Sequence, residues 1–182
     1  MNKAIVMLAD GVEECEALLV VDILRRAGTE VVTVSINKTT KVISSHQITL
    51  YADEIIKETN FEEADILVLP GGLKGTENLS MNQVVLEQCK NFAEKKMLAA
   101  ICAAPSILAS LGLLEGKKAT VHPNFEEKMH GAVLTHGHVA VDGNIITGQG
   151  LAAGIEFSLE LAARLEGKEK SEKVARGICC KI

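Results

Sequence analysis

The sequence predicts a single α/β domain with a mostly parallel central sheet. Apolar runs rich in β-branched residues alternate with helical patterns along almost all of the 182 residues. This alternation is typical of parallel strands joined by helices that cover both faces of a sheet. No internal repeat, low-complexity stretch or linker interrupts it. One domain spanning residues 1–182 is therefore expected, with a size that buries a full core.

The individual elements follow from apolar periodicity and from the glycines and prolines that end each run. Strands are predicted at 3–8, 31–35, 65–69 and 97–101, and shorter strands at 42–43, 48–51, 119–121, 133–135, 138–141 and 144–147. Helices are predicted at 13–27, 82–95, 103–111, 151–165 and 168–177. Gly28 ends the first helix, and Pro70 ends the predicted strand at 65–69.

The first helix is apolar nearly all round over residues 17–24. A helix on a protein surface normally shows a single apolar stripe. One face can pack on the sheet, but the other also needs cover. We expect a homodimer in which this helix forms the interface. The alternative is burial under the short strands at 42–51 of the same chain.

Composition excludes several classes of protein. The net charge is −5 without a basic cluster, so the footprint of a nucleic-acid-binding protein is missing. No apolar run reaches the roughly 18 residues of a membrane span, and the first residues do not resemble a signal peptide. We therefore expect a cytoplasmic protein.

The five cysteines are odd in number, irregularly spaced and without a C-x-x-C pair, which argues against a disulfide framework and a structural zinc site. His136 and His138 share a face but lack a third ligand, so no metal is expected. The glycines at 148, 150 and 154 depart from a dinucleotide-binding motif, and no P-loop occurs. We expect no cofactor.

Cys102 is the leading candidate for a nucleophile. It follows the predicted strand 97–101 and precedes a helix, with Ala100 and Ala104 on either side. Small residues at these positions are typical of the sharp turn of a nucleophile elbow. The start of a helix beside the sulfur predicts a thiol pKa lowered from about 8.5 to roughly 3.5–7.5. The alternative is a small buried core cysteine.

Three further features are predicted at the same edge of the sheet. After the strand 65–69, the glycines of Pro70-Gly71-Gly72 allow a backbone N–H to stabilise an oxyanion together with that of Ala103, although a plain tight turn has the same pattern. Glu13 and Glu16 both begin the first helix, and spacing alone does not choose between them. His122 ends a short strand and is a candidate general base, or else simply an exposed histidine.

Four motifs in this order resemble the ThiJ/PfpI superfamily, and within it the branch of the Parkinson-disease protein deglycase, over residues 4–174. The motifs are Gly11-Val12-Glu13-Glu14-Cys15-Glu16, Leu69-Pro70-Gly71-Gly72, Ala99-Ala100-Ile101-Cys102-Ala103-Ala104-Pro105 and Thr120-Val121-His122-Pro123. The resemblance implies a flavodoxin-like, class I glutamine amidotransferase-like sandwich and a homodimer involving the first helix. Ala104-Pro105 and Gln149 depart from animal members and look like those of microbial ones.

The resemblance also assigns roles to single residues. It implies Cys102 as nucleophile, Glu16 as a protonated acid hydrogen-bonded to it, and His122 as a pocket residue. The N–H groups of Gly72 and Ala103 are implied to form the oxyanion-type site.

The activity that the resemblance implies is detoxification of reactive dicarbonyls. This means glutathione-independent conversion of methylglyoxal to lactate, or removal of glycation adducts from proteins or nucleotides. The alternative is a redox-sensing chaperone that works through oxidation of Cys102 without turnover. A cysteine peptidase or amidotransferase is less favoured, since peptidase members place a histidine where Ala103 stands.

Overall fold

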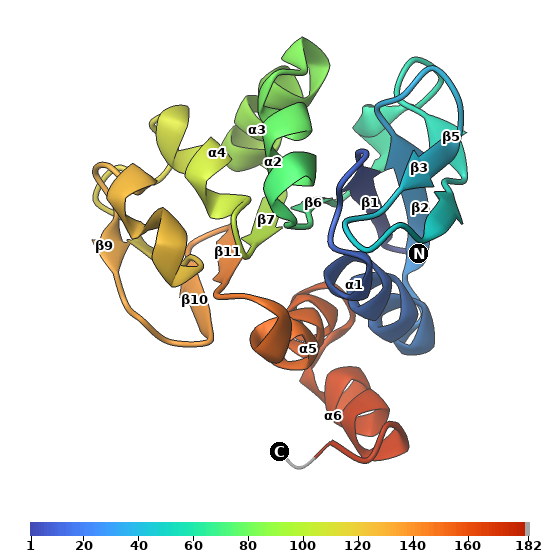
Figure 1. Cartoon of the computed structure of the whole chain (residues 1–182). Coiled ribbons are helices and arrows are strands. Elements are labelled where there is room, and N and C mark those ends of the chain that lie inside the picture. The colour runs from blue at the N-terminus through green and yellow to red at the C-terminus, as the bar shows by residue number, and fades with distance from the viewer. Residues whose placement is uncertain (181–182) are drawn as a thin grey trace.

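A computed structural model describes residues 1–180 of the chain, and its core is a seven-stranded sheet (Figure 1). The strand order is β10-β11-β7-β6-β1-β2-β5. The strands are β1 (Lys3–Leu8), β2 (Glu30–Ser35), β5 (Glu54–Ile55), β6 (Ile66–Leu69), β7 (Met97–Ile101), β10 (Val139–Asp142) and β11 (Ile145–Gly148). Every neighbouring pair is parallel except β10 and β11. The predicted α/β class with a mostly parallel sheet is confirmed.

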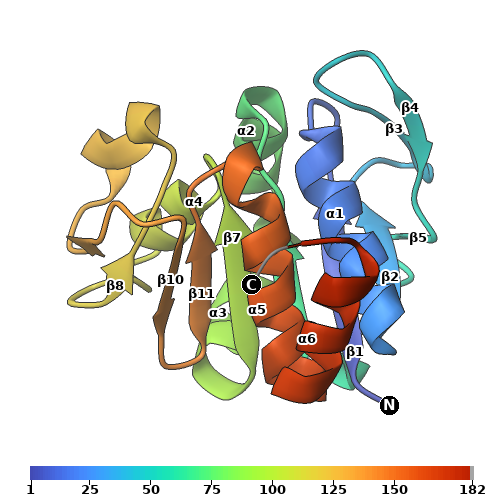
Figure 2. The ribbon, with the colours of Figure 1, turned by 90° about the horizontal axis from the view of Figure 1, so that it is seen from below.

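Helices cover both faces of this sheet (Figures 1 and 2). One face carries α1 (Glu14–Ala27), α5 (Gly154–Glu166) and α6 (Lys168–Gly177), and the other carries α2 (Leu73–Ser80), α3 (Gln83–Lys95) and α4 (Pro105–Ser110). Successive β1 residues divide between the two cores: Val6 packs in the first, and Ile5 and Met7 pack in the second. This is the period of two expected for a strand buried on both faces.

Smaller elements lie outside the central sheet. Strands β3 (Lys41–Ile43) and β4 (Thr49–Tyr51) form an antiparallel pair, and β8 (Lys118–Ala119) pairs in parallel with β9 (Val133–Leu134). Three short 3-10 helices are η1 (Phe61–Glu63), η2 (Pro123–Lys128) and η3 (Leu151–Ala153). Among residues 1–180, no helix is both long and apolar enough to cross a membrane.

The structure corrects the prediction at several elements. Helix α4 begins at Pro105 rather than at 103, and the predicted helix 151–165 is divided into η3 and α5. Helix α2 was not predicted, because its sequence contains glycine and serine and has weak helix propensity. Tertiary hydrogen bonds stabilise its first turn, where the Gly75 N–H donates to Gly11 O.

Most of the apolar surface of α1 is covered within the same chain. Val20 and Leu24 are fully buried and share one core with Val42 of β3 and with residues of α5 and α6. Figure 2 shows α1 flanked by α5 and α6 on one side and by β3 and β4 on the other. Leu18 remains 47% exposed. The alternative of cover by the same chain thus explains most of this helix, and the homodimer stays a prediction.

Candidate active site

Three loops meet beyond the carboxyl ends of β1, β6 and β7, the edge where open α/β sheets bind ligands. The loop after β1 leads into α1 and brings Glu16, the loop after β6 brings Gly71 and Gly72, and the turn after β7 brings Cys102. Residues far apart in the sequence therefore surround one sulfur atom.

Cys102 occupies a sharp turn between β7 and α4. Its φ of 64° lies in the left-handed region, which non-glycine residues rarely adopt and which costs on the order of 1–3 kcal/mol. The Cys102 N–H donates to Gly148 O of β11, and its carbonyl accepts a hydrogen bond from the His122 N–H, both at 2.9 Å. The strained conformation is thus held from two sides, as in a nucleophile elbow.

The structure separates the two candidate carboxylates. Glu16 is only 1% exposed, and its Oε2 accepts a hydrogen bond of 3.0 Å from the Gly71 N–H. Its carboxyl group also shares a hydrogen bond with the Cys102 thiol. Glu13 instead caps α1, where its Oε2 accepts from the Glu16 N–H at 2.7 Å. Glu16 is therefore the carboxyl group in contact with sulfur.

Gly71 is required for this close approach. A Cβ atom at this position would lie 2.5 Å from both Cys102 Cβ and Glu16 Oε2, and 3.1 Å from Cys102 Sγ. Gly72, with φ of 90°, follows and donates its N–H to the sulfur, as does Ala103. Pro70-Gly71-Gly72 is thus more than a plain turn, although the sequence did not single out Gly71.

The thiol and carboxyl groups form a coupled pair. Burial raises the pKa of the Glu16 carboxyl to about 7. Burial, with the charge and hydrogen bond of Glu16, also raises the pKa of the Cys102 thiol to about 12, against the effect of the Gly72 and Ala103 N–H groups. The prediction of a lowered thiol pKa is therefore wrong in direction. The two groups are in contact, so ionisation of one opposes ionisation of the other, and near neutral pH the pair shares one proton.

Cys89 and Cys15 differ from Cys102 in their exposure to solvent. Cys89 is fully buried in α3, and burial raises its pKa to about 12. Cys15 is exposed, and the charge of Glu13 together with burial raises its pKa.

His122 lies beside the site as a half-buried residue that caps η2. Its Nδ1 accepts a hydrogen bond of 3.3 Å from the Asn124 N–H. In the neutral ring Nε2 then carries the proton, so the side chain is a hydrogen-bond donor. This tautomer does not suit the predicted role of general base.

A pocket of about 470 Å³ opens next to the sulfur. Its lining residues come from α2, the turn after β7 and η2: Leu73, Cys102, Ala103, His122, Asn124, Phe125 and Lys128. Sequence patterns do not identify Leu73, Asn124, Phe125 and Lys128, because no local motif links them to a site. Their position depends on where η2 and α2 pack.

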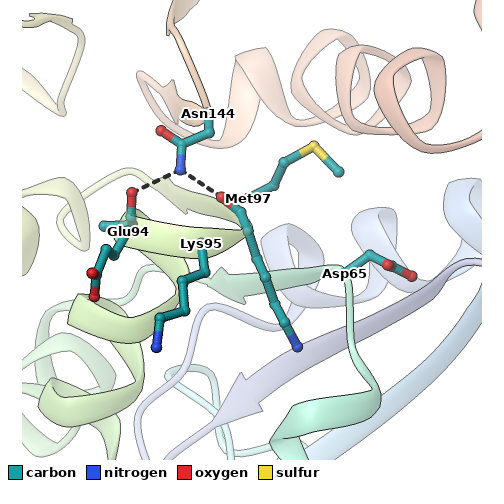
Figure 3. Close-up of a pocket in the computed structure, with 7 residues that line it drawn as sticks. Asp65, Glu94, Lys95, Met97 and Asn144 are labelled. Carbon is teal, nitrogen blue, oxygen red and sulfur yellow. Dashed lines mark hydrogen bonds between the residues drawn. The ribbon is translucent and has the colours of Figure 1, made fainter.

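A second hollow, of about 560 Å³, lies at the opposite edge of the sheet (Figure 3). Its lining includes Asp65 and Met97, at the starts of β6 and β7. The Asn144 amide donates hydrogen bonds to the carbonyls of Ala93 and Lys96, completing the end of α3. None of the residues around Cys102 lines this hollow. Its Asn144 side chain has a structural role, since it holds the end of α3.

The histidines considered as metal ligands are separate in the structure. His136 pairs with Glu126 and His138 with Glu156, each at 3.2 Å. Another group, Glu13, Glu14 and His46, places ligand atoms within 4.8 Å of one another.

The Glu14 carboxylate in this group already binds the His46 Nδ1 at 2.8 Å and the Ser45 hydroxyl at 3.1 Å. Burial alone would raise its pKa, but hydrogen bonds from its own N–H, two serines and His46 lower it to about 2. Hydrogen bonds from Ser45 and His46 therefore already occupy the Glu14 carboxylate.

Comparison with known proteins agrees with this arrangement. The model of the DJ-1/PfpI family matches residues 2–164. The chain belongs to the DJ-1/PfpI family. Protein DJ-1 homolog B of Arabidopsis thaliana is 36% identical over 176 residues, which cover 96% of this chain and 40% of that protein. Homolog A, 39% identical, is covered to 45%, so the chain spans less than half the length of both plant relatives.

Two other members of the DJ-1/PfpI family match over most of their own length. A deglycase of Pyrococcus abyssi is 32% identical over 148 residues, covering 80% of this chain and 88% of that protein. Oxidised DJ-1 of Toxoplasma gondii superposes with a TM-score of 0.96 at 34% identity, with both chains fully covered. The predicted superfamily and its flavodoxin-like, class I glutamine amidotransferase-like fold are thereby confirmed.

Proposed function

We propose that this protein detoxifies reactive dicarbonyls through Cys102, as a glutathione-independent glyoxalase or as a deglycase of proteins or nucleotides. The observation that carries the proposal is the buried contact between the Cys102 thiol and the Glu16 carboxyl at the base of an open pocket. A general base works best with a pKa near the operating pH, and burial raises that of Glu16 to about 7. The similarity to a named deglycase supports the proposal.

The chemistry begins with addition of sulfur to the aldehyde carbon of a 2-oxoaldehyde. Glu16 passes the thiol proton to the carbonyl oxygen, giving a hemithioacetal. The Gly72 and Ala103 N–H groups, which already donate to sulfur, stabilise negative charge on the reacting atoms. Glu16 then moves a proton from the former aldehyde carbon to the neighbouring carbon, while the hydroxyl proton passes to the ketone oxygen, which gives the thioester of a 2-hydroxy acid. Water hydrolyses the thioester to a 2-hydroxy acid and regenerates the thiol.

The test is the loss of methylglyoxal without glutathione, with lactate measured as product. We expect turnover by the parent protein, none by Cys102→Ser, and full turnover by Cys89→Ser, whose thiol is buried in α3 away from the pocket. Equal turnover by the parent and Cys102→Ser would contradict the proposal.

A second function is oxidation sensing at the same sulfur. A sulfinic acid at Cys102 would find hydrogen-bond donors in Gly72, Ala103 and protonated Glu16. The structural relative from Toxoplasma gondii was solved in an oxidised form, which favours this alternative. Mild peroxide should then add two oxygen atoms at Cys102, as mass spectrometry measures. A parent protein that oxidises in this way but shows no turnover would favour the sensor, acting as a redox-regulated chaperone.

A further inference from the structure

Among the side chains that line the pocket beside Cys102, only that of Lys128 carries a permanent charge. The other lining residues are apolar or polar, and none carries a carboxylate. Within residues 1–180, Lys128 makes no ion pair. Its neighbour Glu126 is engaged with His136 at 3.2 Å. Among residues 1–180, a cation without a carboxylate partner thus stands at the wall of a pocket whose base holds a nucleophile.

The position of this cation is tied to the reactive turn. Lys128 ends η2, and η2 begins directly after His122, whose N–H donates to the Cys102 carbonyl. The Lys128 Nζ lies 5.0 Å from the centre of the Phe125 ring, which also lines the pocket. A contact of this kind with an aromatic face favours a cation without neutralising its charge. The ammonium group therefore lies over the ring of another pocket residue, and within residues 1–180 it is not bound to a carboxylate.

We propose that Lys128 makes the pocket selective for 2-oxoaldehydes that carry an anionic group, a carboxylate or a phosphate, at the end remote from the aldehyde. This inference rests on the proposed function and names its substrate class. With sulfur at the aldehyde carbon, the volume of about 470 Å³ leaves room for a short chain whose anion meets the ammonium group. Lysine acts as a point charge, so it accepts either anion.

The reaction needs no added oxidant. For 4,5-dioxopentanoate, addition of one water and an internal shift of hydrogen give 2-hydroxyglutarate. The aldehyde carbon is oxidised to a carboxylate while the neighbouring ketone carbon is reduced to an alcohol. The remote carboxylate is unchanged and serves for recognition alone.

The first experiment compares 4,5-dioxopentanoate with its neutral methyl ester, and both with hydroxypyruvaldehyde phosphate. Lys128→Gln keeps most of the side chain and removes its charge. We expect this variant to lower kcat/KM for the two anions by about fivefold or more, because the lost interaction lies in strength between an exposed ion pair and a charge-assisted hydrogen bond. We expect kcat/KM for the ester to stay unchanged. A loss for only one anion would assign the subsite to carboxylates or to phosphates. Lys90→Gln, an exposed lysine of α3, is the matched control.

A second experiment does not depend on turnover. Iodoacetate and iodoacetamide alkylate the same sulfur and differ chiefly in charge. Lys128→Gln should lower the ratio of their rates at Cys102 several-fold, and added salt should lower that ratio in the parent protein. An unchanged ratio, or an equal loss of kcat/KM for the anions and the ester, would overturn the assignment of Lys128. Absence of turnover with a normal shift in the alkylation ratio would instead overturn the proposed function and leave the anion subsite supported.

Discussion

Replacing Glu16 by Gln separates the two properties of Cys102, its reactivity and its turnover. The substitution keeps the shape of the side chain and removes the negative charge that helps to raise the pKa of the Cys102 thiol to about 12. Two unit charges about 4 Å apart interact with about 4 kcal/mol at an effective dielectric constant of about 20, and here this repulsion opposes ionisation of the thiol. At 1.36 kcal/mol per pKa unit, the thiol pKa should fall by about 3, to about 9.

This change predicts faster alkylation of Cys102 by iodoacetamide at pH 8. The thiolate fraction rises about a thousandfold, while the less basic thiolate loses about 16- to 32-fold in intrinsic reactivity. The net expectation is an increase of about 30- to 60-fold. Dicarbonyl turnover should instead fall by about 10²–10⁴, because Gln cannot transfer the proton. Alkylation is followed by mass spectrometry, and folding by circular dichroism.

Glu13→Gln is the matched control, since it removes a carboxylate three residues away that caps α1 and does not contact the sulfur. It should not accelerate alkylation. If Glu16→Gln is alkylated at the rate of the parent protein, the charge of Glu16 does not raise the pKa of the Cys102 thiol, and the reasoning is refuted. A slower rate would refute the reasoning as well.

Three further predictions follow from the same geometry. Turnover should decline as the pH falls through about 7, because the base Glu16 becomes protonated there; a flat kcat/KM profile between pH 6 and 8 would contradict this. Gly71→Ala should abolish turnover and lower the free energy of unfolding by about 1–3 kcal/mol, since its Cβ collides with Cys102 and Glu16, whereas Gly177→Ala, with open space around it, should not. Leu18→Glu should convert the predicted dimer into a folded monomer in light scattering, and a parent protein that is already monomeric would rule the dimer out.

The choice of Leu18 as the position that tests the dimer depends on the structure. Val20 and Leu24 also lie in the apolar segment 17–24, but glutamate at either position does not test the dimer. Both residues are fully buried within the chain, so a charge there would unfold the protein whatever its assembly state. Leu18 is the large apolar residue of α1 with substantial exposure, and it tests the interface without entering the core.

Local patterns in the sequence were sufficient for the fold class and for most elements. Buried strands such as β6 and β7 are continuous apolar runs ended by proline, glycine or small residues, and these signals lie within a few residues of the elements they define. The same local order placed Cys102 at a strand end and so near the functional edge of the sheet. Helix α2 and strand β5 were missed because tertiary contacts, not propensity, stabilise them.

The sequence by itself determined which residues reach the carboxyl edge of the sheet, because an open parallel sheet places the loops after its strands together there. It did not determine the contacts among them. Glu16 rather than Glu13 meets the sulfur because Gly71 leaves room for the carboxyl group, and Glu13 is used as a helix cap. The raised pKa values come from burial that only packing produces. Lys128 likewise reaches the pocket because η2 folds back beside Cys102, an arrangement decided by tertiary packing and not by any local motif.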